Sequence, residues 1–166
     1  FVGNLYLTYK EGFPEDLEST FIENPDGSKI SYKDLEEESA KYANGFNELG
    51  LKSGDRVSVQ VNKCPEVIFI YLACVRANLI FHPLNTAYKE IELSFFLNDA
   101  KPSVFICEKE IYDSINLLDL EKSIPHLFTL NLLDERPVQL IKKEGDHRVV
   151  DCSDDHTAAL HYSSGT

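Results

Sequence analysis

The chain has 166 residues and a mass of 18.8 kDa, and this length predicts one domain rather than two large independent ones. Hydrophobic residues make up 43% and charged residues 27% of the sequence, which excludes a disulfide-stapled miniprotein and a disordered tail. The 28 acidic residues outnumber the 16 lysines and arginines, so the formal net charge is −12. Such a chain repels nucleic acid and anionic membranes. Any phosphate or carboxylate site in it must therefore be local, built from helix N-termini, backbone amides or a few cations.

The cysteines show no metal-binding or disulfide pattern. The sequence contains four of them, Cys64, Cys74, Cys107 and Cys152, without a Cys-x-x-Cys spacing. The first three lie in or beside apolar runs, which is typical of reduced core thiols in a cytosol-like compartment. The longest apolar run, Val67 to Val75, has nine residues, whereas a membrane span needs about 20. We expect no membrane span and a cytoplasmic location, with the mitochondrial matrix as the alternative if a transit peptide is missing.

The first third of the chain predicts a hairpin followed by a helix. Residues 21–32 hold two short strands around an Asn-Pro-Asp-Gly turn, in which Pro and Gly supply the φ values of a tight reversal. Ser31 then caps a helix, with Asp34 as its partner in a capping box, and Gly50 ends it. The expected inward positions follow spacings of three and four: Leu35, Ser39, Tyr42, Ala43, Phe46 and Leu49.

From residue 56 onward, predicted strands and helices alternate. Residues 56–61 alternate polar and β-branched side chains, which indicates a half-buried strand. Pro65 suits the first position of an apolar helix that ends at Asn78. The rest predicts helices over 66–77, 89–98 and 111–118 and strands over 79–82, 103–107 and 127–130, with Ile91, Phe95 and Phe96 facing inward. This order is typical of an α/β fold: a doubly wound, mostly parallel sheet with covering helices, here preceded by a small N-terminal β-hairpin.

The C-terminal part predicts a surface segment and then an anion-binding loop. Residues 134–155 are strongly charged, which indicates a long surface excursion with one edge strand at 138–141. Residues 157–162 resume as a buried strand that runs directly into Ser163, Ser164, Gly165 and Thr166. Small residues, hydroxyls and free amides at the carboxyl edge of a parallel sheet can cradle a phosphate. By itself, however, this tetrapeptide is more typical of an ordinary turn.

The other polar residues give no catalytic constellation. The five histidines lack HxxxH and HxH spacings, and no serine lies in a Gly-x-Ser-x-Gly elbow, so nothing favours a hydrolase. We interpret residues 36–38, three glutamates, as a solvated helix face rather than a metal site. His82 is expected to be a satisfied near-core histidine, and Arg76 a structural ion pair or a cation at a helix C-terminus. No catalytic or metal-binding residue is assigned.

Several segments together resemble one enzyme superfamily. Residues 162–166, Tyr-Ser-Ser-Gly-Thr, resemble the first half of the phosphate loop of adenylate-forming enzymes, which reads Tyr-Thr-Ser-Gly-Thr-Thr-Gly-x-Pro-Lys-Gly. This superfamily contains acyl-CoA synthetases, luciferases and peptide-synthetase adenylation domains. Residues 30–35, 49–57 and 71–83 resemble three further landmarks in the superfamily's order. The resemblance covers the chain from about Leu5 to Thr166.

Within the superfamily, residues 61–66 and 81–88 look most like the malonyl-CoA synthetases, whose text is Val-Glu-Lys-Ser-Pro-Glu and then Pro-Leu-Asn-Thr-Ala-Tyr. Two departures are visible. Ser163 replaces the usual Thr and keeps its hydroxyl, and Asn78 replaces the usual Gly and tolerates a left-handed φ.

The resemblance implies an ATP-dependent acid–CoA ligase that forms an acyl-adenylate and transfers the acyl group to coenzyme A. ATP, Mg²⁺, coenzyme A and a small carboxylate, with malonate favoured, would be its cofactors and substrates. Ser163, Ser164, Gly165 and Thr166 would contact the β- and γ-phosphates through hydroxyls and backbone amides.

The same resemblance implies that residues 1–166 are a partial N-terminal AMP-binding domain, truncated inside the phosphate loop and inert by itself. The alternative is a non-catalytic α/β module that binds a nucleotide or a protein.

Overall fold

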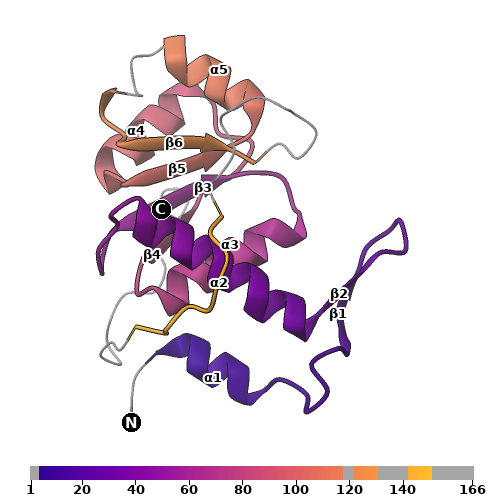
Figure 1. The fold of residues 1–166 in the computed structure, drawn as a ribbon. Coiled ribbons are helices and arrows are strands. Elements are labelled where there is room, and N and C mark those ends of the chain that lie inside the picture. Colours follow the sequence, from indigo (N-terminus) through magenta and orange to yellow (C-terminus); the bar gives the residue numbers. More distant parts are fainter. Residues whose placement is uncertain (1–3, 118–121, 131–141, 151–166) are drawn as a thin grey trace, which may run out of the picture. The chain divides into compact units, whose positions relative to one another are not determined.

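The computed structural model describes residues 4–117, 122–130 and 142–150, which form a mixed α/β structure (Figure 1). The chain divides into two compact units. The first comprises residues 1–50, 64–78 and 141–156, and the second comprises residues 51–63, 79–140 and 157–166. Among the helices of the described ranges, none is long and apolar enough to cross a membrane.

The first unit begins with a short helix and a hairpin. Helix α1, Leu5–Glu11, starts at Asn4, whose side chain accepts a hydrogen bond from the Tyr6 N–H at 2.8 Å. Strands β1, Thr20–Glu23, and β2, Lys29–Ser31, pair antiparallel, and the turn between them has a left-handed glycine, Gly27. The predicted hairpin is therefore confirmed, whereas α1 was not predicted.

Helix α2, Tyr32–Glu48, has the predicted start and end. The Ser31 N–H donates to the Asp34 carboxylate at 2.8 Å, and the Asp34 N–H donates to Ser31 Oγ at 3.1 Å, which completes the capping box. Beyond the helix, Gly50 has a φ of 86°. The predicted inward residues are buried, except that Leu49 is half-buried.

Helix α3, Pro65–Arg76, has a proline in its first turn, as predicted, and packs against α1 and α2. Asn78 follows it with a φ of 58°, the left-handed conformation that asparagine tolerates, as expected for this residue.

Residues 142–150 complete the first unit without forming a helix or strand (Figure 1). Most of them are exposed, as the predicted surface excursion requires, but they are also tied to α2, because the Lys143 N–H donates to the Lys41 carbonyl at 3.1 Å. The predicted edge strand at 138–141 lies outside the described residues.

The second unit contains a parallel sheet, which confirms the predicted fold class. Its described strands are β3, Arg56–Gln60; β4, Ile80–Pro83; β5, Val104–Cys107; and β6, His126–Thr129. They are arranged in the order β4-β3-β5-β6, and all neighbours run parallel. The chain places β4 on one side of β3 and then β5 and β6 on the other. The direction of chain progression therefore reverses between β3 and β5, and in open α/β sheets ligands bind at the carboxyl ends of the strands beside such a reversal.

Two helices cover one face of this sheet. Helix α4 is Glu90–Ala100 and helix α5 is Lys109–Leu117. Leu93 and Leu97 of α4 form a core cluster with Phe105 and Cys107 of β5, and Ile111 of α5 packs against it. Cys107 and Cys74 are fully buried free thiols and Cys64 is half-buried, in line with the expectation for these three cysteines.

Strand β3 corrects one prediction, because it is not half-buried. Val57, Ser58, Val59 and Gln60 are all buried, since β3 is an interior strand with β4 and β5 on its two sides. Its polar side chains are accommodated by hydrogen bonds, including a 2.6 Å contact between Ser58 Oγ and His82 Nδ1. Alternation of polar and apolar residues therefore did not mean exposure on one face.

Helix α4 corrects a second prediction. Ile91 is 85% exposed and Phe95 is 63% exposed, so neither faces inward, while Phe96 is half-buried against the core cluster. The buried positions are Leu93, Leu97 and Ala100. Apolar residues occur on both sides of this helix, so its periodicity is compatible with either face being buried. Contact with β5 buries the face that carries Leu93 and Leu97.

Candidate functional site

The predicted phosphate-loop residues, Ser163, Ser164, Gly165 and Thr166, lie outside the described residues. Their contacts therefore stay a prediction. Among the described residues, each of the two units contains a hollow.

The hollow of the second unit lies at the carboxyl ends of the strands, beside the reversal between β3 and β5. It is a small pocket of about 220 Å³, lined by Gln60, Asn62, Thr86, Lys89, Glu108, Glu110 and Ile111. Gln60 ends β3, Thr86 follows β4 and Glu108 follows β5. The fold thus collects polar side chains from three successive strand ends at the edge where an α/β sheet binds ligands.

Gln60 organises this pocket. Its Nε2 donates to the Asn85 carbonyl at 2.8 Å and to the Tyr88 carbonyl at 3.2 Å, which holds the connection between β4 and α4 against β3. Across the reversal, the Asn62 N–H donates to the Glu108 carboxylate at 2.7 Å. Hydrogen bonds between neighbouring strand ends therefore hold the lining of this pocket together. The charged groups of the lining are one cation, Lys89, and two carboxylates, Glu108 and Glu110. A pocket with this charge balance suits a small polar molecule rather than a polyphosphate.

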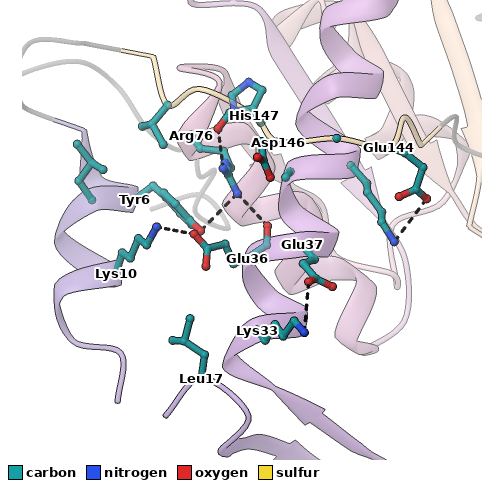
Figure 2. A pocket seen from close by; sticks show the side chains of 15 residues that line it. Tyr6, Lys10, Leu17, Lys33, Glu36, Glu37, Arg76, Glu144, Asp146 and His147 are labelled. Carbon is teal, nitrogen blue, oxygen red and sulfur yellow. Dashed lines mark hydrogen bonds and ion pairs between the residues drawn. The ribbon is translucent and has the colours of Figure 1, made fainter. Parts of the chain in front are cut away.

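The hollow of the first unit is a larger groove of about 730 Å³ between α1, α2 and residues 144–149 (Figure 2). Its lining contains four basic side chains, Lys10, Lys33, Lys41 and Arg76, and four acidic ones, Glu36, Glu37, Glu144 and Asp146. The charges balance, so the groove has no net field that would select an anion or a cation.

Arg76 lies at the centre of the side chains in Figure 2, and it is buried, with 4% of its surface exposed. Its Nη1 donates to the Glu36 carbonyl at 2.9 Å and to Ser39 Oγ at 3.0 Å. Its Nη2 donates to the His147 carbonyl at 2.8 Å. The guanidinium also lies over the Tyr6 ring, 4.5 Å from its centre. Arg76 is the last residue of α3, so the predicted helix C-terminal cation is confirmed, but its bonds go mainly to neutral oxygens.

Burial affects the titration of the groups around Arg76. Burial, followed by the nearby Arg76, lowers the pKa of His147 to about 4, so this imidazole is neutral at pH 7. Burial also raises the pKa of Tyr6 above its ordinary value and outweighs the opposite effect of Arg76. The buried Arg76 guanidinium therefore lies beside a tyrosine and an imidazole that are both neutral at pH 7.

The three glutamates at 36–38 differ from the predicted solvated face. Only Glu37 is exposed. Glu36 forms an ion pair with Lys10, and Glu38 binds Lys41 and Lys142, each at 3.1 Å. Within the described ranges, no cluster of three or more His, Cys, Asp or Glu residues could hold a metal ion. His82 is fully buried against Ser58, as predicted.

Sequence reasoning missed Asn4, Tyr6 and His147. Asn4 could have been recognised as a helix N-cap, because Asn precedes a short apolar helical pattern. No local signal reveals that its Nδ2 also donates to the carbonyls of Val75 at 3.0 Å and Val150 at 2.7 Å, which are 71 and 146 residues away.

The described fold, with a parallel sheet and its strand-end pocket, defines a doubly wound α/β protein. A family model described as AMP-binding enzyme matches residues 11–166, so the chain belongs to this family of adenylate-forming enzymes. The predicted resemblance is thereby confirmed.

Among curated proteins, the chain is similar to crotonobetaine/carnitine–CoA ligase of Salmonella paratyphi B. The two are 26% identical over 148 residues, which cover 83% of this chain and 29% of the ligase. Among solved structures, ATP-bound MatB from Rhodopseudomonas palustris is 30% identical, with a TM-score of 0.80 over 96% of this chain and 32% of MatB. The anthranilate CoA ligase AuaEII shares the fold, with a TM-score of 0.83 over 99% of this chain and 32% of AuaEII at 20% identity. The chain thus spans about a third of the length of these proteins.

Proposed function

We propose that the protein to which this chain belongs is an acid–CoA ligase that activates a small carboxylic acid with ATP. The observation that carries the proposal is the similarity of 96% of the chain, at 30% identity, to an enzyme solved with ATP bound. The family match over residues 11–166 supports the same reaction class. In this proposal residues 1–166 are part of the N-terminal AMP-binding domain.

The proposed reaction has two steps. A carboxylate oxygen attacks the α-phosphorus of ATP, the bond to the bridging oxygen breaks, and pyrophosphate leaves with that oxygen. The thiol of coenzyme A then loses its proton and attacks the acyl carbon, and AMP leaves with the carboxyl oxygen. Ser163, Ser164, Gly165 and Thr166 would hold the β- and γ-phosphates with hydroxyls and backbone amides, so their contribution is positioning and charge stabilisation.

Mg²⁺ is the usual companion of ATP in phosphoryl and adenylyl transfer. The described residues offer no cluster of acidic side chains or histidines that would hold it. We therefore assign no residue of the described ranges to the metal and derive no step through it.

The proposed substrate is malonate. The support is the likeness of residues 61–66 and 81–88 to malonyl-CoA synthetases and the similarity of the chain to MatB, a malonyl-CoA synthetase. Fold similarity extends to an anthranilate ligase, so the fold does not select among acids.

The test is carboxylate-dependent release of pyrophosphate by the full-length protein. We expect activity with malonate, a lower rate with methylmalonate, and little with acetate or a long-chain fatty acid. Without coenzyme A, the reaction should stop at the acyl-adenylate. A preference for long-chain fatty acids would refute malonate while leaving the ligase proposal intact, and no carboxylate-dependent release with any acid would refute the ligase.

The phosphate-loop residues can be tested in the same assay. Ser164→Ala and Thr166→Val should each lower kcat/KM for ATP about 10- to 100-fold, because each removes a hydrogen bond to a charged phosphate. Ser53→Ala, in an exposed turn before β3, is the matched control and should leave kcat/KM unchanged. Equal kinetics for all three variants would contradict the assignment.

A non-catalytic nucleotide-binding or protein-binding module is the second candidate. The same experiment distinguishes this module from a ligase, because a nucleotide-binding module would bind ATP and gain thermal stability without releasing pyrophosphate.

A further inference from the structure

Tyr9 of α1 and Tyr71 of α3 touch through their phenol hydroxyls. The two oxygens lie 2.8 Å apart in a hydrogen bond, and the ring centres lie 6.3 Å apart with an angle of 50° between the ring planes. The ortho carbons of a phenol are the neighbours of the carbon that carries the hydroxyl. The contact therefore sets the hydroxyl-bearing edges of the two rings against each other, and each of these edges includes an ortho carbon.

Other contacts between the same two helices hold this tyrosine pair in place. Asn4, the N-cap of α1, donates from Nδ2 to the Val75 carbonyl of α3 at 3.0 Å. The guanidinium of Arg76, the last residue of α3, lies over the Tyr6 ring of α1, 4.5 Å from its centre. Because α1 is fastened to α3 at these two further points, the two phenols stay close to each other.

Tyr9 is the accessible member of the pair. Its exposed fraction is 37%, whereas the other tyrosines of the described ranges, Tyr71 among them, are buried or half-buried. An oxidant that arrives from the solvent therefore meets the ring of Tyr9 more readily than any of those other tyrosines. The phenol that Tyr9 touches is Tyr71.

Tyr71 stays protonated at neutral pH. Burial, followed by the hydrogen bond with Tyr9, raises the pKa of Tyr71 above its ordinary value. Oxidation of Tyr71 must therefore remove a proton together with an electron. The Tyr9 oxygen lies at hydrogen-bonding distance, where it can accept that proton.

We propose that Tyr9 and Tyr71 are an oxidative modification site, at which hydrogen peroxide and a haem peroxidase join the two rings as dityrosine. Each phenol gives up one electron and its hydroxyl proton and becomes a phenoxyl radical. The two radicals form a carbon–carbon bond between their ortho carbons, and the hydrogen on each of these carbons then moves as a proton to the phenol oxygen. The peroxide takes up the two electrons and two protons and leaves as two water molecules.

The test is oxidation of the full-length protein with hydrogen peroxide and a haem peroxidase, followed by proteolysis and mass spectrometry. We expect a joined pair of peptides that contain Tyr9 and Tyr71, lighter by two hydrogens than the separate peptides, together with dityrosine fluorescence. Tyr9→Phe and Tyr71→Phe should each lose this pair of peptides, because phenylalanine keeps the ring but has no hydroxyl from which the radical forms. Tyr112→Phe, at a half-buried tyrosine of α5, is the matched control and should keep it.

The urea unfolding midpoint provides a second readout. Tyr9 and Tyr71 are 62 residues apart in the sequence, and a covalent link between them restricts the unfolded chain. After the same oxidation, the wild type should therefore have a higher midpoint than Tyr9→Phe. Equal midpoints would overturn the cross-link.

Three results of the mass spectrometry would also overturn the proposal. They are the absence of the joined peptides from the oxidised wild type, a link of Tyr9 mainly to another tyrosine, and a link that disappears on dilution and so joins two molecules. None of these measurements depends on ligase activity, so the outcome is independent of the proposed function.

Discussion

At the scale of single residues, Gly50 and Gly12 both end a helix but differ in backbone conformation. Gly50 has a φ of 86°, whereas Gly12 has a φ of −83°. A Cβ at Gly50 would meet no atom within 4 Å, so any cost of Gly50→Ala comes from the backbone alone. We expect Gly50→Ala to lower the free energy of unfolding by about 1 kcal/mol.

Gly12→Ala is the matched control for this prediction. Its Cβ would lie 3.4 Å from the Tyr9 carbonyl, an ordinary contact, and its φ suits alanine. Urea unfolding should give a midpoint close to that of the wild type. A lower midpoint for Gly12→Ala than for Gly50→Ala would contradict the assignment of the cost to φ.

At the scale of elements, α4 carries a test of which face is inward. Leu97 is 3% exposed in the core cluster and Phe95 is 63% exposed. Leu97→Ala should lower the free energy of unfolding by about 2–4 kcal/mol, because it leaves a cavity under the helix. Phe95→Ala should cost less than about 1 kcal/mol. Equal losses of unfolding free energy for the two variants in urea would contradict the assignment of the Leu97 face as the buried face of α4.

The elements also show which predictions were within reach of the sequence. The hairpin, the start of α2 at Ser31 and its end before Gly50 were predicted correctly, since each depends on residues within a few positions of one another. The inward face of α4 and the burial of β3 were not, because each depends on neighbours from distant parts of the chain.

At the scale of the whole molecule, the chain spans about a third of the enzymes it resembles. We expect the 166-residue chain alone to release no carboxylate-dependent pyrophosphate, because positioning of ATP, acid and coenzyme A requires groups from the remaining two thirds of such an enzyme. The full-length protein is the control, and circular dichroism should show that the isolated chain is folded. If the isolated chain with a carboxylate released more pyrophosphate than the carboxylate-free blank, this expectation would be contradicted.

The candidate site was predictable to different degrees. The text of residues 162–166 and its order after the other landmarks identified the family, which the match over residues 11–166 confirmed. A parallel sheet predicts a pocket at the carboxyl ends of its strands, such as the one around Gln60. Which residues line that pocket depends on the strand order β4-β3-β5-β6. The Arg76 cluster was not predictable, because its members are far apart in the chain: Tyr6 lies 70 and His147 lies 71 positions from Arg76.

The sequence by itself determined the family, the alternation of strands and helices and the local caps, because these depend on side chains close together in the chain. Only the tertiary structure decided which face of α4 is covered, that polar Ser58 and Gln60 are buried in β3, and that Arg76 and Asn4 hold residues 147–150. These features arise when distant segments exclude water from one another, so that hydrogen bonds between them become strong and specific.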